Sequence, residues 1–178
     1  MSNTSPLKTQ RFTLRPLQPS DAAALFPTMA DNEVSLYLTR PAFESEAELW
    51  DWLAAPDWPG LTWIAEDASG AVAARFVAVP AHAPDVFEVG YITALAQQGQ
   101  GVASECMEAL IAHLWEGDAA TGRAPARKLT AEVDTRNTPS IRLLEKLGFT
   151  REAHLREHEM THAGMCDVYW YGLLKGEA

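Results

Sequence analysis

The chain is 178 residues long, 47% of its residues are hydrophobic and 21% are charged, and its formal net charge is −10. This length allows one domain with a sizeable core, and we expect residues 1–178 to form a single domain. The negative charge argues against a general nucleic-acid binder, which presents a basic face to the phosphates. It agrees with a cationic partner, such as an amine or a basic peptide, and also with charge that serves solubility alone.

The sequence has no sign of a membrane span or an export signal. No apolar run approaches the roughly 18 residues that a membrane span needs. The first residues, MSNTSPLKTQRF, lack the apolar region of a signal peptide. Two cysteines, Cys106 and Cys166, give neither a disulfide framework nor a cysteine-based zinc site. We therefore expect a cytoplasmic protein with no membrane partner and no metal, either a monomer or a homodimer.

Apolar and polar residues alternate in several segments that are bounded by turn residues, which predicts about six to seven strands. The predicted strands are residues 11–17, 61–67, 71–79, 86–92, 128–134, 150–160 and 166–174. Three of the four predicted helices begin at capping residues: Ser20 or Asp21 before a short helix that Pro27 interrupts or bends, Ser45 with Glu48 in a capping box, and Asn137 or Thr138 with Pro139 in the first turn. The fourth is amphipathic, follows residue 101 and ends at Gly117. This order implies a mixed sheet with helices packed on its faces.

The segment QQGQGVASEC, residues 97–106, connects a predicted strand to the amphipathic helix. Backbone N–H groups at a helix N-terminus lack intrahelical partners, and Gly99 and Gly101 let a ligand approach the backbone closely. The segment is consistent with a pyrophosphate cradle, and also with a tight turn that binds nothing. It is not a P-loop, because Gly-Lys-Ser/Thr is absent. Nor is it a dinucleotide fingerprint, because Ser104 stands where the third glycine belongs.

Two further segments favour the cradle. QQGQGVA matches the pattern Gln/Arg-x-x-Gly-x-Gly/Ala at Gln98, Gly101 and Ala103, follows EVGYI, and precedes NTPSIRLLEKLGF by about 35 residues. Together these segments resemble the GNAT superfamily of acyl-CoA-dependent N-acetyltransferases, and most closely its ribosomal-protein N-terminal acetyltransferase branch. The resemblance extends from RFTLRPLQPSDA to DVYWYGLL. It implies an α/β fold of the α+β type, with a mixed, mostly antiparallel central sheet that is splayed in the middle and has helices on both faces.

The resemblance also implies a binding site for acetyl-CoA as co-substrate. The backbone around the pyrophosphate would be that of Gln98, Gly99, Gln100, Gly101, Val102, Ala103 and Ser104. Pantetheine would pair with the backbone of Tyr91, Ile92 and Thr93. Asn137 would contact the pantetheine arm, and Ser140 would lie near the sulfur.

Acyl transfer to an amine needs a base for the amine proton and an acid for the leaving thiolate, because amines are largely protonated at neutral pH. We single out Ser140 as the acid; its alternative role is that of a helix-start serine bonded to nearby backbone. We single out Glu159 as the base, because in the resembled branch a glutamate lies eight residues before the aspartate that corresponds to Asp167. Glu159 is otherwise an exposed carboxylate at a strand end. Glu88 is a second candidate base with a burial-raised pKa, or else a structural partner for a basic side chain.

The sequence leaves the acceptor open. The resemblance allows a protein N-terminus, a small amine such as a polyamine, an amino acid or an aminoglycoside-like compound, and also a non-catalytic acyl-CoA-binding module. His154, His158 and His162 recur every four residues in a predicted strand and turn, where they read as scattered surface histidines and not as a metal-binding helix face. Four tryptophans fall near the segments that cover the substrate side in the family: Trp50, Trp52, Trp58 and Trp63. Core packing is expected for most of them, and the lining of an acceptor pocket is the alternative for some.

Overall fold

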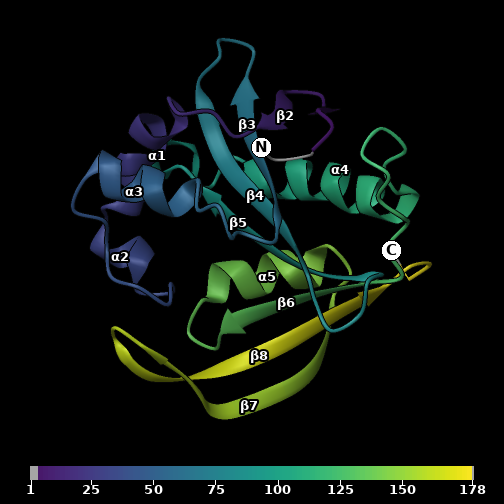
Figure 1. Cartoon of the computed structure of the whole chain (residues 1–178). Helices are drawn as coiled ribbons and strands as arrows, with labels where there is room; N and C mark the ends of the chain where they lie inside the picture. Colours follow the sequence, from purple (N-terminus) through teal and green to yellow (C-terminus); the bar gives the residue numbers. More distant parts are fainter. Residues whose placement is uncertain (1–3, 178) are drawn as a thin grey trace.

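An eight-stranded sheet runs through the computed structural model, which describes residues 4–177 (Figure 1). Its strands are β1 (Leu7–Lys8), β2 (Phe12–Pro16), β3 (Leu61–Asp67), β4 (Val72–Pro80), β5 (Val86–Thr93), β6 (Lys128–Asp134), β7 (Thr150–Thr161) and β8 (Gly164–Leu174). Their order is β1-β2-β3-β4-β5-β6-β8-β7, and only the β5–β6 pair is parallel. The predicted mixed, mostly antiparallel sheet is confirmed. The additional strand is β1, whose two residues are too few to show alternation.

The described chain has five α-helices and one short 3₁₀ helix: α1 (Asp21–Met29), α2 (Asn32–Ser35), α3 (Glu46–Leu53), η1 (Leu95–Gln97), α4 (Val102–Glu116) and α5 (Thr138–Lys146). Pro27 lies inside α1 and does not interrupt it, since the helix continues to Met29. The sequence pattern does not predict α2, since four residues are too short for helical periodicity. None of the helices between residues 4 and 177 has the length and apolar character required to cross a membrane.

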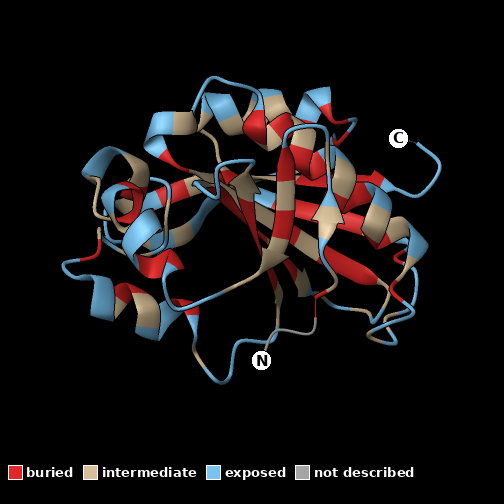
Figure 2. Cartoon of the chain, turned by 90° about the horizontal axis from the view of Figure 1, so that it is seen from above, coloured by how far each residue is buried: buried red, intermediate tan, exposed pale blue. Residues whose placement is uncertain are grey.

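Hydrophobic clusters lie on both faces of the sheet. Trp63, Phe76 and Leu110 are completely buried on the face that packs against α4 and α5, which we call the α4–α5 face. On the opposite face of the sheet, Leu25 of α1 and Leu49 of α3 are completely buried. We call this the α1–α3 face. Figure 2 shows buried residues along the strands and on the inner sides of the helices. Because side chains alternate along a strand, the register decides which face each residue joins.

The helix α1 is fixed to the sheet by a buried ion pair. Arg15 Nη2 on β2 donates to Asp21 Oδ1 at 2.8 Å, and the Asp21 side chain is only 1% exposed. The backbone N–H of Gln18 donates to the other carboxylate oxygen at 2.7 Å. Hydrogen bonds to Asp21 and Glu66 raise the pKa of Arg15. The pair therefore holds the start of α1 against the sheet.

The sheet splits between β5 and β6. These parallel strands pair only at Val86↔Lys128, Phe87↔Leu129 and Glu88↔Thr130. Beyond that point β5 stays paired with β4 up to Thr93, while β6 stays paired with β8 up to Asp134. Each strand follows its antiparallel neighbour, so the two separate and leave backbone groups free along the gap. The predicted splay in the middle of the sheet is confirmed.

Candidate active site

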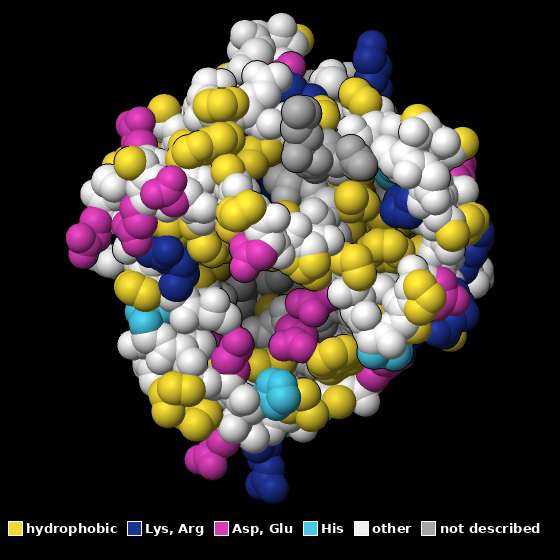
Figure 3. Space-filling model, in the orientation of Figure 1, with side chains coloured by type: hydrophobic (Ala, Val, Ile, Leu, Met, Phe, Trp, Pro, Cys, Tyr) yellow, Lys and Arg dark blue, Asp and Glu magenta, His cyan; other side chains and the backbone are white. Residues whose placement is uncertain are grey.

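A cleft of about 1170 Å³ occupies the gap between β5 and β6. Its walls are the two strands, the loop before α4, the start of α5, the segment around α2, and the β7–β8 hairpin. Figure 3 shows a hollow near the middle of the molecule, with Asp and Glu side chains at its margin. The lining residues come from both faces of the sheet, with α5 on one side and the segment around α2 on the other, an arrangement in which two reactants can meet from opposite sides.

The loop before α4 has the geometry of an anion cradle. Gly101 is the N-cap of α4 with φ 77°, and Gly99 has φ 72°. Both lie in the left-handed backbone region, which glycine adopts without the steric cost of a Cβ. The first N–H of the helix to reach a backbone carbonyl is that of Glu105, which donates to Gly101 at 3.1 Å. The N–H groups of the first turn are left for a ligand, and the helix dipole favours an anionic one.

Most of the predicted coenzyme residues line this cleft. They are Tyr91, Ile92, Thr93, Gln98, Gly99, Gly101, Val102, Ala103, Ser104, Asn137 and Ser140. Gln100 does not line it. The Gln100 amide folds back to donate to the Ala96 carbonyl at 2.8 Å, and the Gln100 carbonyl accepts from Arg11 Nη1 at 3.0 Å. Gln100 and Arg11 thus support the loop from outside.

Lys146 is a cleft residue that the sequence pattern does not predict. It lies in the last turn of α5, lines the cleft, and donates from Nζ to Ser104 Oγ at 2.9 Å. It is the only lysine or arginine among the described residues that line the cleft. Since 42 residues separate it from Ser104, no local pattern indicates the contact. The contact places a positive charge beside the anion cradle.

Two hydroxyl groups meet in the cleft, one from β5 and one from α5. Tyr91 Oη lies 2.7 Å from Ser140 Oγ. The N-cap of α5 is formed by Asn137 Oδ1, which accepts the Ser140 N–H at 3.2 Å, so the Ser140 hydroxyl is not used for capping. Burial raises the pKa of Tyr91, which keeps its phenol protonated. Both hydroxyls can therefore donate a proton.

Six acidic residues line the cleft, of which Asp31 and Glu33 lie at the start of α2 and Asp134 is paired with Arg136. The other three come from three strands: Glu88 on β5, Glu132 on β6 and Glu159 on β7. The register places all three on the α1–α3 face. Burial raises the pKa of Glu88, and the negative charges of Glu132 and Glu159 raise it further. Burial and Glu159 also raise the pKa of Glu132, against the lowering effect of His158. This wall attracts cations, and Glu88 is at the point where the strands separate.

Asp167, the aspartate whose spacing singled out Glu159, has a structural role. Its carboxylate accepts the backbone N–H of Glu157 at 2.8 Å and contacts His154 Nε2 at 2.8 Å. Glu157 has φ 46° and lies in an irregularity of the β7–β8 register between Leu155 and Glu159. Hydrogen bonds from Glu157 and His154 lower the pKa of Asp167. Asp167 therefore stabilises the distortion that precedes Glu159.

The repeated histidines lie along β7 and its turn, as the sequence predicts, and not on a helix. Within residues 4–177 no three His, Cys, Asp or Glu side chains are grouped so that they could hold a metal ion.

Residues 11–150 match the family model of the acetyltransferase (GNAT) domain. The chain belongs to the GNAT acetyltransferase family. A relative from Bacillus licheniformis, the uncharacterized N-acetyltransferase p20, is 28% identical over 186 residues, which cover 96% of this chain and 97% of the relative. The chain is thus an acyl-CoA-dependent N-acetyltransferase, which transfers an acetyl group to an amine.

Two solved GNAT structures share the fold. Spermidine N-acetyltransferase from Vibrio cholerae, in complex with CoA and spermine, has a TM-score of 0.76 and 20% identity, over 96% of its chain and 93% of this one. RimL, the ribosomal L7/L12 α-N-protein acetyltransferase, in complex with coenzyme A, has a TM-score of 0.78 and 19% identity, over all of its chain and 98% of this one. Both of these proteins were solved with coenzyme A bound.

Proposed function

We propose that this single-domain enzyme acetylates a small cationic amine that enters the cleft from the α1–α3 face. The observation that carries the proposal is the wall of Glu88, Glu132 and Glu159, three carboxylates from three strands on one face of the sheet. An ammonium group is the natural counter-ion for such a wall, and the net charge of −10 steers cations toward the protein. The spermidine N-acetyltransferase of like fold, solved with spermine, supports a small amine as the acceptor.

On the opposite face, the cradle before α4 is proposed to hold the pyrophosphate of acetyl-CoA. The N–H groups of Val102, Ala103 and Ser104 begin the helix, and Lys146 adds the positive charge that a phosphate needs beside them. The free backbone of Tyr91, Ile92 and Thr93 is proposed to pair with pantetheine, and Asn137 Nδ2 to bind the same arm. When bound, acetyl-CoA supplies a thioester carbonyl that an amine can attack.

Glu88 is our first candidate for the base. Its raised pKa brings a carboxylate closer to the pKa of an amine, which makes it a better acceptor for the amine proton. Glu159, which faces the same cleft, is the second candidate. The C–N bond forms as the C–S bond breaks. The base or a water takes the nitrogen proton, and the departing sulfur receives a proton from the Tyr91–Ser140 hydroxyl pair.

A panel of acceptors tests the proposal, with release of the free thiol of coenzyme A and the intact mass of the product as readouts. The panel contains polyamines, amino acids, aminoglycosides and short peptides with free N-termini. We expect acetylation of small amines, and lower turnover in Glu88→Gln than in Glu159→Gln. Acetylation of peptides alone would identify the protein N-terminus as the acceptor, which the likeness to RimL would support. No thiol release with any acceptor would refute the proposed function.

A further inference from the structure

Arg75, in the middle of β4, is a buried cation without a counter-ion. The residue is 8% exposed, and no described residue forms an ion pair or a hydrogen bond with it. Burial lowers its pKa to about 10, so it is still charged at neutral pH. By contrast, five other arginines form ion pairs with carboxylates: Arg11, Arg15, Arg40, Arg127 and Arg136. Unpaired buried charges are rare in folded proteins and point to a missing partner.

Two tryptophans flank the Arg75 guanidinium. Its Cζ lies 4.9 Å from the ring centroid of Trp52 and 5.7 Å from that of Trp58. Both tryptophans are more than one-third exposed, at 38% and 37%, so these two are not core residues. Aromatic rings stabilise the faces of a guanidinium, but its N–H groups lie at the edge and still need acceptors. The arrangement orients the cation and leaves its hydrogen-bonding edge unused.

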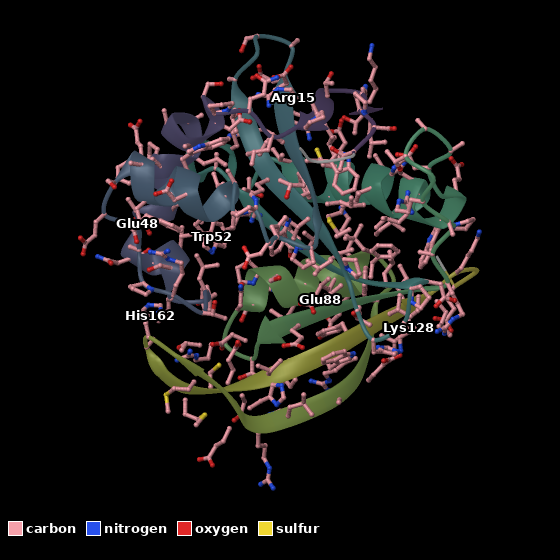
Figure 4. The ribbon with its side chains drawn as sticks, viewed as in Figure 1. Arg15, Glu48, Trp52, Glu88, Lys128 and His162 are labelled. Carbon is pink, nitrogen blue, oxygen red and sulfur yellow. The ribbon has the colours of Figure 1, made fainter. Side chains whose placement is uncertain are left out.

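A pocket of about 200 Å³ lies against this guanidinium. Its lining residues are Leu38, Trp52, Arg75, Val77, Gly90, Tyr91 and Ile92, and four of these also line the large cleft: Leu38, Gly90, Tyr91 and Ile92. In Figure 4 Trp52 lies on α3 at the end that faces the middle of the molecule, and Glu88 lies nearer the centre. The pocket is therefore a side chamber of the cleft.

The register places the chamber on the acceptor side. Arg75 is opposite Ile92, and Val77 is opposite Gly90, so these residues share the α1–α3 face with Glu88. Gly90 lines both cavities, and it leaves this wall free of a side chain, since a Cβ at this position would lie only 3.1 Å from Val77 Cγ2. One acceptor molecule can thus contact both the guanidinium and the carboxylate wall.

We propose that Arg75, flanked by Trp52 and Trp58, binds a carboxylate of the acceptor, so that the enzyme acetylates an amine that also carries a carboxylate. This inference rests on the proposed function and narrows its substrate class to amino acids. A carboxylate suits the site because its two oxygens match the N–H fork of a guanidinium. The charges also match those of an amino acid, with the Arg75 cation for its carboxylate and the anionic wall for its amine. Along β5 the position opposite Arg75 is about four residues from Glu88, roughly 13 Å of backbone at the strand rise.

Matched pairs of acceptors test this inference. Glycine, β-alanine, 4-aminobutyrate and 6-aminohexanoate are each compared with the corresponding amide, which keeps the amine and loses the carboxylate charge. For at least one chain length we expect the acid to exceed its amide in kcat/KM by about 10- to 100-fold, the range of a charge-assisted bidentate contact. In Arg75→Gln that preference is lost through a higher KM for the acid, while kcat and the KM for acetyl-CoA stay within about twofold. Arg75→Lys keeps part of the preference.

Arg40→Gln is the matched control. Arg40 also stacks on an aromatic ring, with its Cζ 3.5 Å from the Phe43 centroid, but it lines neither cavity and is paired with Glu48. We expect this variant to keep the acid-to-amide ratio. An unchanged ratio in Arg75→Gln, or equal losses for acids and amides, would show that Arg75 is only structural and overturn the inference.

A binding measurement separates this inference from the proposed function. With coenzyme A present, the preferred acid should raise the unfolding temperature of the wild type, its amide should not, and Arg75→Gln should lose the effect. Wild-type turnover of acids and amides at equal efficiency would refute the carboxylate site and leave the proposed function intact. No turnover of any amine would refute both.

Discussion

The hydroxyl pair of Tyr91 and Ser140 offers the sharpest test of the chemistry. Tyr91→Phe removes only the phenol oxygen, because its ring still packs on Phe76 at a centroid distance of 6.4 Å. Ser140→Ala keeps the cap of α5, which uses the Ser140 N–H and not its hydroxyl. Loss of one neutral hydrogen bond costs about 1 kcal/mol of stability, which lowers the unfolding temperature of a domain of this size by about 2–4 °C.

The expected kinetic effect is larger than the structural one. If the two hydroxyls form a single route for the proton to the leaving sulfur, each variant lowers kcat about 100-fold, which is about 2.7 kcal/mol of barrier. The double variant should then be no slower than the slower single variant, since both lose the same route. Single-turnover rates for the wild type, the two single variants and the double variant complete this double-mutant cycle. Tyr169→Phe is the control, because Tyr169 does not line the cleft. A double variant that is about 10⁴-fold slower than the wild type, the product of the two single effects, would refute the shared proton route. A kcat within twofold of the wild type in either single variant would also refute it.

Three further predictions concern the cradle, the base and the fold. Lys146→Ala should raise the KM for acetyl-CoA about tenfold with little change in kcat, because a charge-assisted contact is lost, and Lys175→Ala should change neither. Burial raises the pKa of Glu88 above its ordinary 4.5, so the folded protein holds this proton more tightly than the unfolded chain. Wild-type stability should therefore fall as the pH rises from 4.5 through the raised pKa of Glu88. Glu88→Gln should make this fall shallower when unfolding is measured over the same pH range. Asp21→Ala removes one of the two carboxylates paired with Arg15, which keeps Glu66, and should reduce the free energy of unfolding by about 1.5–3 kcal/mol, measured with denaturant.

Each of these has a contradicting result. An unchanged KM in Lys146→Ala would remove the lysine from the coenzyme site. An identical pH dependence of unfolding in Glu88→Gln would mean that another carboxylate carries it. A loss below about 1 kcal/mol in Asp21→Ala would mean that the ion pair does not fix α1.

Short-range signals made the backbone of the proposed coenzyme side of the cleft predictable. Gly99 and Gly101 indicate a backbone that a ligand can approach closely, and the structure gives both residues a positive φ beside the cleft. Asn137 indicates an N-cap, and its Oδ1 accepts the Ser140 N–H as expected. Such features depend on φ and ψ and on hydrogen bonds between neighbours in sequence, so a short segment determines them. The acceptor side lacks signals of this kind, because its residues come from different strands.

The sequence by itself determined the family, the order of the elements, the splayed sheet and the loop that begins α4. Only the tertiary structure decided that Tyr91 meets Ser140 across 49 residues and that Lys146 meets Ser104 across 42. It also decided that Arg75 lies between two tryptophans with no acid beside it. Strand register and helix packing set these contacts, and both depend on the whole core. A local pattern therefore identifies the donor of the acetyl group, whereas the recognition of its acceptor depends on how distant segments pack together.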